Sequence, residues 1–154
     1  MTNPVVVIGV GNPYRRDDGI GPAVVERLRR MGLDDVTLAE SDGEAMALIL
    51  LWDERQLAIL VDAMRADPAH PGRVHRLVVP WPAGDRARAA SSHAMDTGDA
   101  VELARELGRL PQRLVVFGVE VTDTGFGLGL TPAVAEAADR VAAEIRATCL
   151  ERTA

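Results

Sequence analysis

Short apolar runs recur along the chain, each bounded by residues that are typical of turns. The first, Val5–Ile8, is a continuous β-branched run, which is typical of a strand buried on both faces of a sheet. Together with four later runs it predicts five strands, at residues 5–8, 36–40, 57–61, 73–79 and 113–119. The first strand leads into Gly, Asn and Pro residues that predict a turn.

Between these strands, apolar residues at intervals of three and four predict amphipathic helices. The predicted helices cover residues 19–32, 44–52 and 96–108, and a last helix begins near residues 131–132. One apolar stripe of the last helix ends at Cys149, which we therefore expect to pack inward as a small hydrophobic residue. The stretch from Pro80 to Met95 has no clear period and predicts an irregular loop.

Strands that alternate with helices predict an α/β fold. We expect a single three-layer α/β/α domain over residues 1–154, with a mostly parallel five-stranded sheet. The connection between the third and fourth strands has about ten residues, fewer than the dozen or more that a parallel crossover needs. The fourth strand is therefore predicted to run antiparallel.

Charge and cysteine content narrow the function classes. The formal net charge is −6, and all 17 basic residues are Arg. This balance argues against a nucleic-acid-binding protein, which normally presents a basic face. The single cysteine excludes a disulfide-built scaffold. No apolar run approaches the length of a membrane span, so we expect a cytoplasmic protein with no membrane partner.

Candidate chemistry follows the strands, since ligands of α/β sheets bind beyond the carboxyl ends of strands. Asp18 follows the first strand, Asp62 ends the third, and His93 lies in the long loop after the fourth. Two carboxylates and one imidazole suit a divalent transition metal with open positions for a substrate. Neighbouring carboxylates repel each other unless a cation or a shared proton offsets their charge, which also indicates a metal.

Each of these residues also has a plainer interpretation. Asp18 could cap the following helix, and Asp62 could form a turn. Periodicity gives no preference for His93, and His70 and His75 are interpreted as surface residues. The glycines after the first strand do not match a dinucleotide fingerprint, because Tyr14 occupies the third glycine position.

Taken in order, the motifs resemble those of the hydrogenase maturation endopeptidases, which trim the C-terminus of the nickel-iron hydrogenase large subunit. The resemblance rests on the blocks IGVGNPYRRDDGIG (8–21), ILVDA (59–63), SSH (91–93) with VELA (101–104), VVFGVE (115–120) and GLTPAV (129–134). These blocks cover nearly the whole chain. One departure is the stretch after His93, Ala94–Asp99, where many relatives have Leu or Phe and then Gly-Leu.

The resemblance implies that Asp18, Asp62 and His93 form a metal-contacting, catalytic triad. It further implies that the substrate is a nickel-iron hydrogenase large-subunit precursor, and that nickel arrives with this substrate and is not held tightly by the free protein. The enzyme would then remove a C-terminal extension. The residues do not decide whether the metal polarises the scissile carbonyl or a carboxylate activates water.

Two other functions remain open from the sequence. A nickel-dependent assembly factor would bind the large subunit through the same triad without cutting it. A peptidyl-tRNA hydrolase shares the opening Gly9–Pro13, but it needs a His-Asn pair soon after this loop and a basic surface for tRNA. We expect the protein to be a monomer.

Overall fold

The computed structural model describes residues 3–79 and 97–153. Its five strands are β1 (Val5–Val10), β2 (Val36–Ser41), β3 (Leu57–Met64), β4 (Val74–Val79) and β5 (Arg113–Glu120). They form one sheet in the order β2-β1-β3-β5-β4. All neighbouring strands are parallel except β4 and β5, which are antiparallel. The predicted sheet and its antiparallel fourth strand are thus confirmed.

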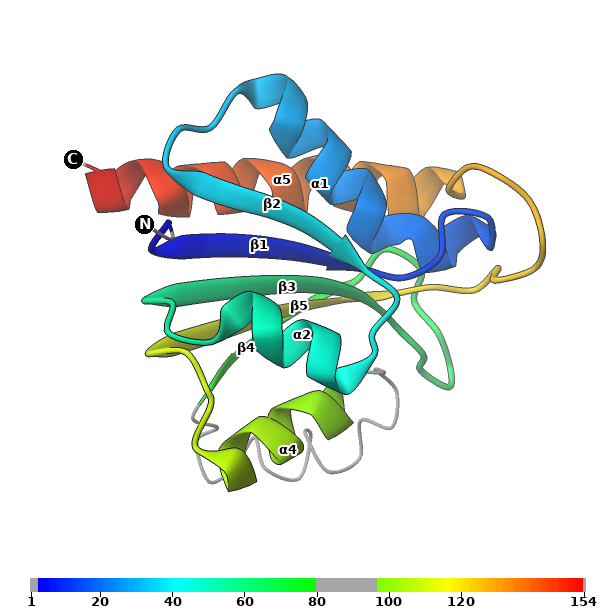
Figure 1. Cartoon of the computed structure of the whole chain (residues 1–154). Helices are drawn as coiled ribbons and strands as arrows, with labels where there is room; N and C mark the ends of the chain where they lie inside the picture. The colour runs from blue at the N-terminus through cyan, green and yellow to red at the C-terminus, as the bar shows by residue number, and fades with distance from the viewer. Residues whose placement is uncertain (1–2, 80–96, 154) are drawn as a thin grey trace.

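Helices cover both faces of this sheet and complete the predicted three layers (Figure 1). Four α-helices are described, preceded by a short 3-10 helix: η1 (Arg16–Gly19), α1 (Ile20–Met31), α2 (Ala45–Trp52), α4 (Gly98–Leu107) and α5 (Pro132–Thr153). Residues of α1 and α5 share one apolar core with the sheet, and residues of α2 and α4 share the other. Within residues 3–79 and 97–153, no helix is long and apolar enough to cross a membrane.

The alternation of side chains along the central strands divides the two cores. In β3, Ile59 and Val61 pack with α1 and α5, whereas Ala58 and Leu60 pack with α2 and α4. The prediction for Cys149 is confirmed, since this residue is buried in the α1–α5 core. Burial also raises the pKa of its thiol above the ordinary value.

The predicted end of the third strand is wrong. β3 continues past Asp62 to Met64, because Ala63 and Met64 pair in register with Val119 and Glu120 of β5. The polar Asp62 therefore lies within a strand and not after it. The predicted loop from Pro80 to Met95 lies outside the described residues.

Candidate active site

The loop after β1 carries Asp18 back against the end of its own strand, and glycines make this possible. Gly11 has a φ of +137°, a region that favours glycine, and a Cβ at this position would collide with the carbonyl oxygen of Asp18. Gly21 lies equally close to the backbone of Val10 and Val61. The start of α1 therefore packs directly on the end of β1 and on β3 at Val61.

Asp18 holds this loop in place with one of its two carboxylate oxygens. Its Oδ2 accepts a hydrogen bond from the backbone N–H of Asn12 at 2.9 Å. The helix that follows has Gly19 as its N-cap, and no side chain bonds that end. The capping interpretation of Asp18 is therefore wrong. Among the described residues, Asn12 is the one hydrogen-bond donor to this carboxylate.

Asp62 is buried within the sheet and is only 1% exposed. Alternation along β3 turns its side chain to the face covered by α2 and α4. It lies one residue beyond Val61, which pairs with Gly9 in the last pair between β1 and β3. Carboxylates are rarely buried this deeply unless they are paired or functional. The turn interpretation of Asp62 is wrong, because the residue is in mid-strand.

Asp62 is thus level with the carboxyl end of β1, and η1, which contains Asp18, contacts β3. That the two carboxylates act at one site stays a prediction. His93 lies outside the described residues. Within residues 3–79 and 97–153, no three His, Cys, Asp or Glu side chains lie close enough to hold a metal ion. The two carboxylates are the part of the predicted donor set that the structure describes.

Asp17, the neighbour of Asp18, is a structural residue that the sequence analysis did not single out. It is fully buried, and its carboxylate accepts hydrogen bonds from the backbone N–H of Thr131 at 2.8 Å and from the Thr131 hydroxyl at 2.9 Å. Its backbone N–H donates to the carbonyl of Asp123 at 2.9 Å. Asp17 therefore ties η1 to the loop between β5 and α5. No signal in the sequence links positions 17 and 131.

A third buried carboxylate, Glu120, lies at the end of β5 beside Met64 of β3. Its Oε2 lies 2.7 Å from His75 Nε2, and its Oε1 accepts the backbone N–H of His70 at 3.0 Å. His75, interpreted as a surface residue, is half-buried on the edge strand β4, with its side chain 28% exposed. Burial acts to raise the pKa of Glu120, but the bonds from His75 and His70 and the charge of Arg73 outweigh burial and lower it.

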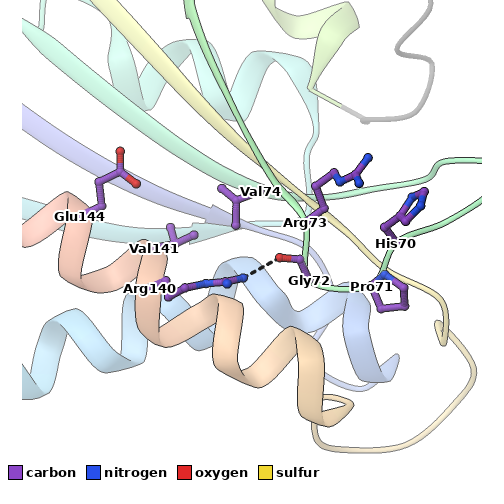
Figure 2. Close-up of a pocket in the computed structure, with 8 residues that line it drawn as sticks. All are labelled: His70, Pro71, Gly72, Arg73, Val74, Arg140, Val141 and Glu144. Carbon is purple, nitrogen blue, oxygen red and sulfur yellow. Dashed lines mark hydrogen bonds between the residues drawn. The ribbon is translucent and has the colours of Figure 1, made fainter.

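A cavity of about 520 Å³ lies between the start of β4 and α5 (Figure 2). Arg140 of α5 donates to the carbonyl of Gly72 at 2.8 Å, whereas His70 and Arg73 point away from the helix. The cationic groups therefore do not converge on one point. Neither Asp18 nor Asp62 lines this cavity, so it is separate from the candidate active site.

Comparisons with known proteins all point to the same protein family. A model of the hydrogenase maturation protease family matches residues 22–148. The hydrogenase expression/formation protein HupD of Bradyrhizobium diazoefficiens is 31% identical over 154 residues, covering 96% of this chain and 77% of HupD. The hydrogenase 2 maturation protease of Escherichia coli is 28% identical over 132 residues, covering 84% of this chain and 80% of that protein.

Solved structures agree with this result. The hydrogenase maturating endopeptidase HybD from E. coli superposes with a TM-score of 0.78 and 25% identity, covering 96% of this chain and 93% of HybD. The structural similarity therefore extends over nearly the whole chain.

Proposed function

Because this chain belongs to the hydrogenase maturation protease family, we propose that it removes the C-terminal extension of a nickel-iron hydrogenase large-subunit precursor after nickel insertion. The family consists of hydrolases, so the chain is an enzyme. The observation that supports the finer proposal is the burial of Asp62, a carboxylate only 1% exposed, in a strand that η1 with Asp18 contacts. Two carboxylates at one site would favour a cationic substrate group.

The nickel in this proposal is part of the substrate. Asp18 and Asp62 would offer it oxygen ligands, and His93 would add an imidazole nitrogen, a mixed set that suits a divalent transition metal. The Asn12 N–H fixes the orientation of Asp18 before the substrate arrives, so little freedom is lost on binding. Binding the nickel would place the C-terminal peptide bond of the precursor at the sheet edge.

The test is intact-mass analysis of a nickel-loaded large-subunit precursor incubated with the protein and with Asp18→Asn, Asp62→Asn and His93→Ala. We expect the wild type to remove the extension and each variant to lose at least about 100-fold in rate, the scale of a lost catalytic group. Asp34→Asn is the matched control, because Asp34 is an exposed acid in the turn before β2. It should cleave at the wild-type rate.

Three outcomes would contradict the proposal in different ways. Cleavage by Asp62→Asn at the wild-type rate would remove Asp62 from the mechanism. Efficient cleavage of a metal-free precursor in the presence of a chelator would favour direct carboxylate chemistry, in which one acid is protonated and the other activates water. Nickel-dependent binding without any loss of mass would indicate an assembly factor.

A further inference from the structure

Three large apolar side chains are exposed together on the loops beside Asp18. Tyr14 is 67% exposed, Phe126 is 92% exposed and Leu128 is 70% exposed. We call these three residues the apolar patch. Tyr14 comes from the loop after β1, and the other two come from the loop between β5 and α5. Single exposed apolar residues are common, but a cluster of them marks an interaction site.

The two loops that carry the patch are bonded to each other. Arg15 and Gly127 form a β-bridge, the N–H of Gly127 donates to the carbonyl of Tyr14 at 2.9 Å, and the N–H of Arg16 donates to the carbonyl of Gly127 at 3.0 Å. Gly127 has a φ of +141°, a conformation that other residues rarely adopt. The positions of the patch side chains are therefore set by backbone bonds.

The buried carboxylate of Asp17 holds the same two loops together. It accepts hydrogen bonds from the backbone N–H and the hydroxyl of Thr131, which is the last residue of the loop between β5 and α5. An apolar surface held in this way cannot easily fold back to bury itself. Its burial must come from a partner, and a preorganised surface loses little conformational entropy when the partner binds.

Hydrogen bonds connect the patch with the carboxylate of Asp18. The backbone N–H of Tyr14 donates to Asn12 Oδ1 at 2.9 Å, and the backbone N–H of Asn12 donates to Asp18 Oδ2 at 2.9 Å. On the other side of the patch, Leu128 lines a cavity of about 300 Å³ together with Pro13 and Gly19. A chain that reaches Asp18 from outside can therefore contact the patch and the cavity at the same time.

We propose that the apolar patch and this cavity dock an apolar segment of the large-subunit precursor, away from the bond that is cleaved. This inference rests on the proposed function. Arg15 specifies the segment further: it is exposed, and no carboxylate of the described residues forms an ion pair with it. In a chain of net charge −6, such a cation favours a segment that also carries an acidic residue.

A second copy of this chain fits the patch less well. Aromatic side chains bury about 150–250 Å² each, so the patch offers on the order of 500 Å². A stable dimer needs about 800 Å² from each partner. A precursor that also occupies the Asp18 edge supplies the remaining area, whereas a copy seated on the patch alone does not.

The experiment measures initial cleavage rates against the concentration of nickel-loaded precursor for the double variant Phe126→Ala/Leu128→Ala. We expect KM to rise at least tenfold while kcat and the melting temperature stay within error of the wild type, because the lost contacts lie away from the reacting bond. Leu50→Ala is the matched control: Leu50 is 68% exposed, close to the value for Leu128, but lies on α2. Arg15→Gln should raise KM a few-fold.

A double variant with the same KM as Leu50→Ala overturns the inference, and an unchanged KM in Arg15→Gln overturns its acidic part. If the wild type cleaves no precursor, the proposed function fails. Surface plasmon resonance then tests the docking surface separately by measuring binding of the precursor. The docking proposal requires the double variant to bind the precursor more weakly than Leu50→Ala does. A wild-type dimer in sedimentation that the double variant dissociates would assign the patch to a second copy and refute the precursor as its occupant.

Discussion

Asp17 and Asp18 are adjacent and chemically identical, yet the structure assigns them opposite tasks, which makes their alanine variants a sensitive test. Asp17 is fully buried and accepts two short hydrogen bonds from Thr131, at 2.8 and 2.9 Å. Asp18 accepts one, from Asn12. We expect Asp17→Ala to destabilise the fold strongly and Asp18→Ala to leave it nearly unchanged.

The magnitude follows from these contacts. A hydrogen bond to a charged group contributes about 1.5–3 kcal/mol, and a buried donor left without its acceptor adds to the loss. Two such bonds at Asp17 give an expected loss of about 3–6 kcal/mol in the free energy of unfolding. For a domain of this size that lowers the melting temperature by on the order of 10 °C. Asp18→Ala should cost less than about 1 kcal/mol, because its bond to Asn12 is exposed to water, which can replace it.

Urea unfolding followed by circular dichroism measures both losses, and calorimetry gives the melting temperatures. The slope of the unfolding curve should be the same for the two variants and the wild type, so that the midpoints report stability. Asp17→Ala within about 1 kcal/mol of the wild type would refute the anchoring role. Equal losses of unfolding free energy in the two variants would show that the greater burial and the additional hydrogen bonds of Asp17 do not make it more important for stability than Asp18.

Two further predictions concern groups outside the proposed site. Glu120 has a pKa below its ordinary value of 4.5, so its contribution to stability is present above that value and is lost as the pH falls through the folded-state pKa. Unfolding free energies measured from pH 7 to pH 3 should therefore fall less steeply in Glu120→Gln, and parallel curves would contradict this. Cys149 is buried with a raised pKa, so thiol reagents should neither label the native protein nor inhibit it. Stoichiometric labelling without unfolding would place the thiol outside the core.

Much of the fold follows from local patterns. The run Val5–Ile8 is apolar at every position because β1 has a neighbouring strand on each side and helices on both faces. The short connection after β3 determines that β4 runs antiparallel. The strand-end rule likewise led to Asp18 and Asp62, because the carboxyl ends of parallel strands meet at one edge. The end of β3 was less accessible, since it depends on pairing with β5.

The functions of single polar residues were not accessible in this way, because they depend on partners far away in the chain. The pattern of β4 does not reveal that His75 meets a carboxylate 45 residues later. The segment around Phe126 is rich in glycine and indicates only a loop. Its bonds to the loop after β1 cross more than 100 residues of sequence, as the contact from Arg15 Nε to the Thr124 carbonyl at 3.2 Å does.

The same long-range bonds connect stability with function. Asp17 holds the loop that carries Phe126 and Leu128, and its neighbour Asp18 lies at the proposed nickel-binding edge. Loss of the hydrogen bonds between Thr131 and Asp17 would therefore displace the apolar patch relative to Asp18. A two-part substrate, with a docked segment and a metal centre, requires that the distance between these two sites be constant. The buried carboxylate of Asp17 would keep it so, which gives a physical reason for two adjacent acids of which only Asp18 would face the proposed substrate.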